Sequence, residues 1–549
     1  MSLSLYYHTL RHLKPSQVVG RVRFALRRPR PDLSAAPPRR LVAATFPLPP
    51  VRQPSLPDEG VFRFLNTARS LTTAEGWNDP RAERLWLYNL HYFDDLNAAG
   101  RERRSAWHER LIARWVVENA PGFGVGWEPY PLSLRIVNWI KWACSGFLLP
   151  ETAVHSLAVQ ARYLKERLEY HLLGNHLLTN AKALVFAGLF FDGDEAKQWL
   201  ETGLEILDKE LAEQILVDGG HFERSTMYHS IVLGDILDLV AADRVYPSIV
   251  PGQLTDRWAR VAGDMFKWLA AMCHPDGDIS FFNDAAFGIA LTPAQLQACA
   301  SVLGVNADAP PKENFIRLEP TGYVRVRRGP WSLIFDMAPV GPDYIPGHAH
   351  ADTLSFELSW NAQRVLTNSG TSSYQVGPQR AWERSTAAHN TVEVDAENSS
   401  EVWSAFRVGR RACPFAKDLG ESNGVLSASA SHDGYRRLKG APVHRMALET
   451  RENTFRVSDT ILGRGVHRAA GYFHFHPDLR LAENTVGGWK IILPQGVILR
   501  IVGHDGLRLE REEGRYAPEF GKVLPRPVLV WRIEKDLPMS AAVEIFEER

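Results

Sequence analysis

Residues 153–191, AVHSLAVQARYLKERLEYHLLGNHLLTNAKALVFAGLFF, carry apolar side chains at spacings of three and four. This spacing gathers the apolar side chains on one face of an α-helix, so the stretch predicts helices that bury one side. Similar patterns run from about residue 80 to residue 300, separated by short Gly, Pro or Asp turns. Serial antiparallel helical hairpins build a solenoid or a closed toroid, and the lack of a repeat of fixed length favours the toroid.

The pattern changes after residue 305, where apolar and polar residues begin to alternate. Residues 322–338, GYVRVRRGPWSLIFDMA, and 353–370, TLSFELSWNAQRVLTNSG, follow this pattern between Gly, Asn and Pro turns. A period of two is typical of strands, and many strands in series predict an antiparallel β-sandwich. We therefore expect a multidomain α+β protein, with a basic, Pro-rich arm at 1–60, a helical toroid at 61–305 and a β-sandwich at 306–549.

Composition excludes several classes of protein. The 549 residues carry no net formal charge, 45% are hydrophobic and 23% are charged, which is typical of a soluble globular protein. Neutrality gives no global field that attracts nucleic acid, and the arginines of the arm lack interleaved aromatic residues. No run approaches the roughly 18 apolar residues that span a bilayer. We expect no nucleic-acid partner and no membrane span.

Two polar clusters interrupt the helical pattern. Residues 169–188, EYHLLGNHLLTNAKALVFAG, place Gly174, Asn175 and His176 where helix propensity disfavours them, unless a helix junction lies there. In residues 218–239, DGGHFERSTMYHSIVLGDILDL, polar and aromatic side chains precede an apolar helix. A tyrosine in this second cluster is either a reactive phenol or an ordinary core aromatic.

The third cluster is PGHAHADTLSFELSW, residues 346–360, at the entrance of a predicted strand. On a strand, His348 and His350 face the same side. Their imidazoles can then converge on one ligand, or one histidine can bind a metal while its neighbour acts in a reaction. In isolation, a pair of loop histidines is more often without function.

Five motifs together resemble a known family. They are GNHLLTNAKALVFAGLFF, DGGHFERSTMYHSIV, GHAHADTLSFEL, TNSGTSSYQ and RSTAAHNTVEVD. Their order and spacing are similar to those of heparinase II/III-like polysaccharide lyases, over residues 80 to 400. The resemblance implies an incomplete α/α toroid followed by an antiparallel β-sandwich, with an acidic polysaccharide as substrate. The family suggests the periplasm, whereas the amino terminus lacks a recognisable secretory signal.

The resemblance also implies a reaction, the β-elimination of a uronic-acid polysaccharide. Asn175, His176 and His348 match the groups that neutralise the substrate carboxylate. Tyr228 matches the acid that protonates the leaving O4, and it can also remove the C5 proton where both groups lie on one face of the sugar. For the opposite epimer, His348 or His176 would be the base. As a base, Tyr228 needs nearby positive charge, and we expect Arg224 and a protonated His348 to supply it.

Further residues are expected at the substrate or at a metal. Trp127 and Tyr130 are candidate platforms for sugar rings, and Arg135 and Arg224 are candidate contacts for a carboxylate or sulfate. In relatives of heparinase II, a structural zinc is bound at the positions that match His350, Asn368 and His389. An asparagine supplies a neutral oxygen instead of a compensating carboxylate, which lowers the expected affinity for zinc.

Two other functions are compatible with the sequence. A glycoside hydrolase needs two carboxylates at the scissile bond, which the chain offers among Glu223, Asp276, Asp278 and Asp284. We expect these acids to lie apart from the histidine and tyrosine motifs. A non-catalytic polysaccharide-binding or exopolysaccharide-biosynthesis factor is the second alternative. Loops set specificity on a shared fold, so the sequence leaves the polymer, the compartment and the oligomeric state open.

Overall fold

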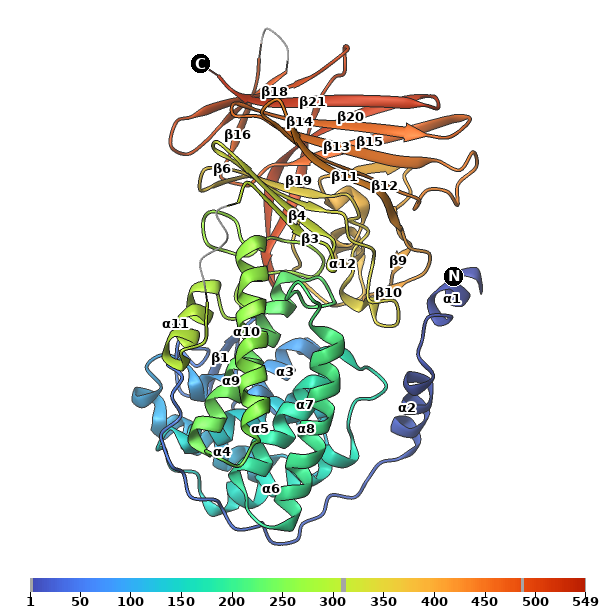
Figure 1. Ribbon diagram of the computed structural model, residues 1–549. Helices are drawn as coiled ribbons and strands as arrows, with labels where there is room; N and C mark the ends of the chain where they lie inside the picture. Colours follow the sequence, from blue (N-terminus) through green and yellow to red (C-terminus); the bar gives the residue numbers. More distant parts are fainter. Residues whose placement is uncertain (1–2, 308–312, 485–487, 549) are drawn as a thin grey trace.

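The computed structural model describes residues 3–307, 313–484 and 488–548. A helical region is followed by antiparallel sheets stacked against one end of it (Figure 1). The predicted order of helical hairpins and antiparallel sheets is therefore confirmed. Among the described residues, no helix is both long and apolar enough to cross a membrane.

The helical region consists mainly of nine helices built around a buried central one. This central helix, α7, is buried along nearly its whole length and packs against α5, α6, α8 and α9. The nine are α3 (Arg84–Tyr92), α4 (Ser105–Glu118), α5 (Pro129–Cys144), α6 (Glu151–Glu166), α7 (Gly174–Phe190), α8 (Asp194–Gln214), α9 (Thr226–Val245), α10 (Gly252–Met272) and α11 (Pro293–Leu303).

Three antiparallel sheets make up most of the second half. The first has the order β3 (Phe315–Leu318), β4 (Tyr323–Arg328), β5 (Trp331–Asp336), β6 (Phe356–Trp360) and β7 (Gln363–Leu366). The second has the order β11 (Pro414–Ser422), β12 (Val425–His432), β13 (Val443–Thr450), β14 (Thr454–Leu462), β21 (Met539–Glu547), β18 (Ile498–Gly503), β17 (Trp489–Ile492) and β16 (Arg480–Glu483). The third has the order β19 (Glu510–Glu519), β20 (Lys522–Asp536), β15 (Val466–His474) and β8 (Val392–Val394).

The first sheet is covered on both faces, although its sequence alternates. Alternation ordinarily marks a sheet with one face in water, yet β5 and β6 are buried along their entire length. Ile334 packs with Trp268 of α10, whereas Leu333 and Phe335 belong to the core between the sheets. The polar residues of these strands alternate with the apolar core residues and share the face of Ile334, which is turned toward the helical region.

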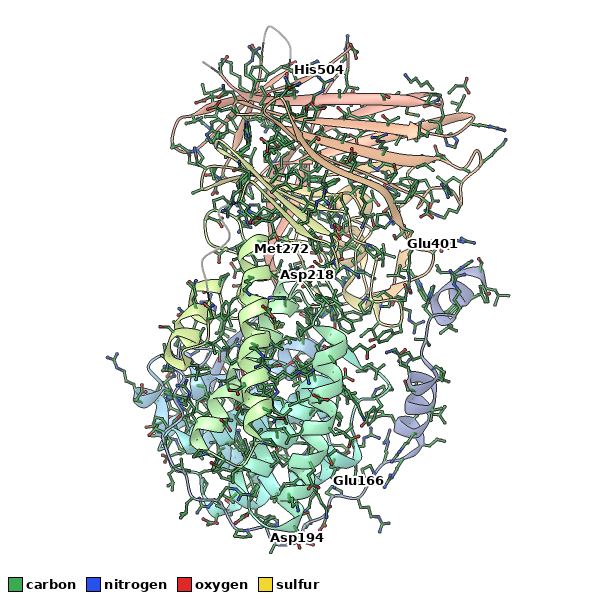
Figure 2. The ribbon with its side chains drawn as sticks, in the orientation of Figure 1. Glu166, Asp194, Asp218, Met272, Glu401 and His504 are labelled. Atoms are coloured by element: carbon green, nitrogen blue, oxygen red, sulfur yellow. The ribbon has the colours of Figure 1, made fainter. Side chains whose placement is uncertain are left out.

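Buried polar contacts fix the sheets on the helices. The guanidinium of Arg325 on β4 donates to the carbonyl of Ala271 at 2.8 Å, which satisfies an end carbonyl of α10. Asp218 accepts hydrogen bonds from the amide and hydroxyl of Thr321 at 3.0 and 2.7 Å. Figure 2 labels Asp218 and Met272, which lie where the two regions meet. These polar contacts therefore hold the sheets against the helical region.

Residues 3–60 pack along the outside of both regions. They include α1 (Leu3–Leu10) and α2 (Pro15–Leu26), two helices that the predicted basic, Pro-rich arm did not contain. Residues 27–60 contain no helix and no strand of several residues. They run along the helical region (Figure 1), where Ala43 donates its amide hydrogen to Val245 at 3.1 Å and Phe46 donates to Cys144 at 2.9 Å.

Candidate active site

A cavity of about 860 Å³ lies where the helical region meets the sheets. Both regions contribute polar and aromatic groups to its wall. Three of the four predicted catalytic residues come from helices and one comes from a loop of the sheet region. The helical side supplies Asn175, His176, Glu223 and Tyr228, and the sheet side supplies His348, Tyr374 and Phe406.

Asn175 and His176 lie at the start of α7, at a helix junction. Leu173 and Gly174 have φ values of +64° and +56°, and a Cβ on Gly174 would lie 2.7 Å from a methyl carbon of Ile345. Only glycine fits this turn without displacing its neighbours. The turn directs the Asn175 amide toward Glu223, to whose Oε1 it donates at 3.2 Å.

His176 is held by a carboxylate and an aromatic ring. Its Nδ1 lies 3.2 Å from Oε1 of Glu169, and its ring centroid lies 4.5 Å from that of Tyr130. Burial lowers the pKa of His176, but the attraction and hydrogen bond of Glu169 outweigh burial and raise it overall. The imidazole is therefore biased toward its protonated, donating form.

Tyr228 lies in the first turn of α9, which Ser225 caps by accepting the Tyr228 amide hydrogen at 3.2 Å. Its hydroxyl lies 2.9 Å from the Tyr374 hydroxyl, and its ring stacks on His348 with centroids 3.8 Å apart. Burial, and then the Tyr374 hydroxyl, raise the pKa of Tyr228 well above its usual value. The phenol therefore holds its proton, as a general acid requires.

The expectation that Arg224 lowers the pKa of Tyr228 is wrong. Arg224 has a φ of +58°, and its Nε donates to the carbonyl of Thr321 at 2.9 Å. Its side chain thus connects the helical region to the sheet region and does not line the cavity. The expectation that Arg224 contacts substrate fails for the same reason.

His348 ends a short 3-10 turn, Pro346–His348, rather than lying on a strand. Its Nδ1 lies 2.8 Å from Oδ2 of Asp284, and Arg380 forms a bidentate ion pair with the same carboxylate. Burial alone would raise the pKa of Asp284, but Arg380 and the two histidines hold it well below its usual value. The permanent carboxylate fixes the proton of His348 on Nδ1 and leaves Nε2 for the cavity.

Glu223 lies between the predicted catalytic groups, where the sequence analysis expected no acid. Its Oε2 lies 3.5 Å from Nε2 of His348 and accepts no hydrogen bond from any described residue. The expectation that the acids lie apart from the motifs is thus wrong for Glu223 and Asp284. Asp284 is enclosed by its partners and does not line the cavity. Asp276 pairs with Arg364 at 2.6 Å and is structural.

Two of the predicted substrate contacts are core residues. Arg135 is completely buried, where it donates to Gln160 at 2.9 Å and lies 3.7 Å from the centre of the Trp115 ring. Trp127 is buried and packs against Tyr163. Both predictions are wrong, because apolar helical packing and buried backbone carbonyls account for these side chains. Tyr130 is the one that lines the cavity.

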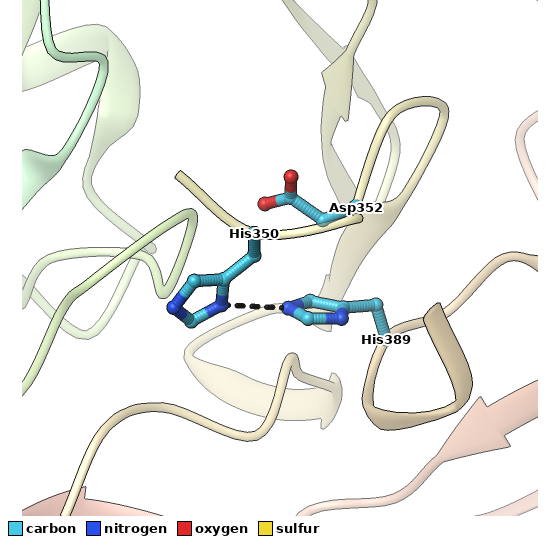
Figure 3. Close-up of side chains that lie close together, drawn as sticks. All are labelled: His350, Asp352 and His389. Carbon is cyan, nitrogen blue, oxygen red and sulfur yellow. Dashed lines mark hydrogen bonds between the residues drawn. The ribbon is translucent and has the colours of Figure 1, made fainter. Parts of the chain in front are cut away.

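His350, Asp352 and His389 form a buried cluster whose ligand atoms all lie within 4.8 Å of one another (Figure 3). Asp352 completes this cluster, whereas the sequence predicted that Asn368 would join the two histidines. The Asn368 amide instead accepts from the Asn390 backbone at 3.3 Å. Asp352 lies inside the motif GHAHADTLSFEL, two residues after His350, and that proximity is the sequence signal that points to it.

The hydrogen bonds of this cluster leave two imidazole nitrogens free to bind a cation. Nε2 of His350 lies 2.9 Å from the permanently charged Asp284, and Nδ1 of His389 lies 2.7 Å from the carbonyl of Ser385. Burial lowers the pKa of both histidines, that of His389 to about 4. The remaining nitrogens, Nδ1 of His350 and Nε2 of His389, then face each other unprotonated at 3.1 Å. Two nitrogen ligands on one zinc are about 3.3 Å apart.

Two family models match most of the chain. The model described as heparinase II/III N-terminus matches residues 146–307, and the model described as heparinase II/III-like, C-terminal, matches residues 310–536. The heparin-sulfate lyase of Bacteroides stercoris is 24% identical over 67% of this chain and 56% of that protein. The FtsZ-localized protein C of Caulobacter vibrioides is 28% identical over 75% of this chain and 73% of that protein. The chain thus spans less than two thirds of the lyase relative.

Solved structures share the fold. The crystal structure of heparinase III has a TM-score of 0.67 and 17% identity, covering 100% of this chain and 86% of that chain. The heparan sulfate lyase HepC mutant from Pedobacter heparinus has a TM-score of 0.63 and 19% identity, covering 97% of this chain and 87% of that chain. The matched models, and the order of helices and sheets, lead to one conclusion: the chain belongs to the heparinase II/III-like family.

Proposed function

We propose that the protein is a polysaccharide lyase that cleaves a uronic-acid-containing polysaccharide by β-elimination. The observation that carries this proposal is the stacking of Tyr228, from a helix, on His348, from the sheet region, in the wall of one cavity. Such a reaction needs an acid and a base beside one sugar ring, together with donors for its carboxylate. Asn175 and His176 supply the donors.

Glu223 has a defined part in this proposal. A uronate carboxylate bound by Asn175 and His176 would lie about 4 Å from the Glu223 carboxylate, and two carboxylates that close do not both keep their charge. Glu223 therefore takes up a proton as substrate binds. Its Oε2, which accepts no hydrogen bond from a described residue, then donates to the substrate carboxylate. The hydrogen bond from Glu223 then stabilises the negative charge that builds up on the substrate carboxylate as the C5 proton leaves.

The chemical step uses the fixed tautomer of His348. Nε2 accepts the C5 proton, the electron pair of that C–H bond forms the C4=C5 double bond, and the C4–O4 bond breaks. Tyr228 donates its proton to O4, and Tyr374, whose hydroxyl lies 2.9 Å away, stabilises the phenolate that forms. The stacked rings approach the sugar from one side, which favours elimination of groups on one face. Tyr228 as both acid and base remains the alternative for that geometry.

We also propose that His350, Asp352 and His389 hold a structural zinc. A bound cation would supply the positive charge that two facing imidazole nitrogens and a carboxylate require. His350 also contacts Asp284, which orients His348. The cluster therefore acts on the reaction only by positioning, through Asp284.

Product chemistry tests the proposed reaction. The purified chain is incubated with a panel of unsulfated and sulfated uronate polymers. A lyase produces ultraviolet absorbance from the conjugated double bond, and the unsaturated fragment is lighter by one water than the corresponding hydrolytic fragment. New reducing ends without absorbance would establish a hydrolase. No fragmentation of any polymer would favour a non-catalytic role, which the relative named FtsZ-localized protein C makes the second candidate.

A further inference from the structure

The helix α2 packs on the protein through one narrow face. Gln17 donates to the carbonyl of Tyr344 at 3.1 Å, and the Phe24 ring centroid lies 4.1 Å from that of His171. A Cβ on Gly20 would lie 3.0 Å from the His171 backbone. Residues 17, 20 and 24 therefore form the packed face of this helix.

The opposite face of α2 is apolar and exposed. Val18, Val19, Val22 and Leu26 are between 51% and 82% exposed. Successive residues in a helix are rotated by about 100°, which places these four side chains on one stripe opposite the packed face. A single exposed valine is ordinary, but a stripe of four on one short helix is an unpartnered surface.

The preceding helix continues this surface. Thr9 holds α1 on the sheet region by accepting a hydrogen bond from the Trp403 indole at 3.1 Å, and the Tyr6 ring lies 5.1 Å from the Trp403 ring. Leu3 and Tyr7, which are one turn apart, are 89% and 63% exposed. Both helices stand at the outer side of the molecule in Figure 1.

Positive charge is concentrated on the same segment. Residues 1–31 contain seven Lys and Arg residues and no Asp or Glu, so the rest of this neutral chain carries seven net negative charges. Lys14 and Arg27 form ion pairs with Glu213 and Glu166. No ion pair within the described residues involves the other five, which are Arg11, Arg21, Arg23, Arg28 and Arg30. Arg21 and Arg23 border the apolar stripe on its two sides.

We propose that α1 and α2 dock on the surface of a membrane that contains anionic lipids. An apolar stripe bordered by arginines is the pattern of a helix that lies in the lipid interface, with its apolar side chains among the acyl chains and its cations at the headgroups. Nucleic acid would use the arginines but leave the apolar stripe in water. A second copy of the chain would have to bury the five arginines that form no ion pair within the described residues.

Vesicle binding tests the proposal with the full chain. We expect co-sedimentation with vesicles of phosphatidylglycerol and phosphatidylcholine, weak binding to phosphatidylcholine alone, and a loss of binding in high salt. The variant Val18→Gln/Val22→Gln/Leu26→Gln keeps helix-forming residues at exposed positions and should bind at least about tenfold more weakly. Arg21→Gln and Arg23→Gln should each weaken binding roughly fivefold.

A matched control uses exposed valines elsewhere. Val117 and Val217 are 83% and 97% exposed, and Val117→Gln/Val217→Gln should bind vesicles as the unaltered chain does. Equal binding of the triple variant and the unaltered chain would overturn the proposal. So would a chain that binds no vesicle and forms dimers that the triple variant abolishes. None of these measurements depends on lyase activity.

Discussion

Replacing Glu223 by glutamine removes one charge from the cavity without changing its shape. In the proposed reaction, Glu223 must become neutral and donate to the substrate carboxylate. Glutamine is already neutral, and its amide can donate at the same position. We therefore expect Glu223→Gln to bind substrate more tightly than the unaltered chain and to keep its turnover within about tenfold.

The size of the effect follows from the geometry. Two charges about 4 Å apart repel by about 4 kcal/mol at the effective dielectric of a partly solvated site, which is the upper limit of the gain. Proton uptake by Glu223 already relieves most of this repulsion, so we expect Kd and KM to fall roughly tenfold to a hundredfold. The hydrogen bond from the Asn175 amide to Oε1 of Glu223, at 3.2 Å, fixes where the side chain at position 223 lies.

Calorimetry in two buffers of different ionisation enthalpy measures the proton directly. The unaltered chain should take up about one proton on binding a uronate oligosaccharide at pH 7, and Glu223→Gln should take up none. Glu83, another carboxylate of the cavity wall, provides the matched control, because Glu83→Gln should leave proton uptake unchanged. Intact binding with no turnover in Glu223→Gln would refute the reasoning and assign Glu223 as the acid or base of a hydrolase.

The remaining predictions concern stability and metal. Burial lowers the pKa of His91 and His229 to about 3, so the unfolded state binds more protons below pH 6.5 and stability falls as pH falls. In urea titrations, these two histidines should lower the free energy of unfolding by about 4 kcal/mol between pH 7 and pH 5. Equal free energies of unfolding at pH 7 and pH 5 would contradict this prediction. Asp284→Asn leaves Arg380 unpaired and should cost about 3–5 kcal/mol, against less than about 1 kcal/mol for the exposed Asp208→Asn. Native mass spectrometry should detect one bound zinc in the unaltered chain and none in His389→Ala, and a metal-free unaltered chain would contradict the zinc proposal.

The order of helices and sheets is predictable because periodicity reports burial directly. Hydrophobic spacing distinguishes residues 153–191 from the strands after residue 305 without any tertiary information. The complete burial of β5 is not predictable in this way. Ile334 of β5 packs against Trp268 of α10, and only the stacking of that sheet on α10 produces this contact.

The site likewise contains residues that the sequence predicts and residues that only the tertiary structure identifies. Asn175, His176, Tyr228 and His348 belong to motifs, and the structure brings all four to one cavity. Contacts between residues distant in sequence decide the rest. Glu223 reaches His348 across 125 positions, and Arg135 is drawn into the core by buried carbonyls. Residue type alone predicted a substrate contact for Arg135 and did not place Glu223 beside His348.

The central claim is that a phenol and an imidazole act on one uronate ring. Tyr228→Phe preserves the ring stacked on His348 and removes only the hydroxyl. On a polymer that the unaltered chain cleaves, formation of unsaturated product should fall by about 10²–10⁴ while oligosaccharide binding stays within about threefold. Tyr374→Phe is the matched control and should lose less. Unsaturated product at an undiminished rate from Tyr228→Phe would contradict the account.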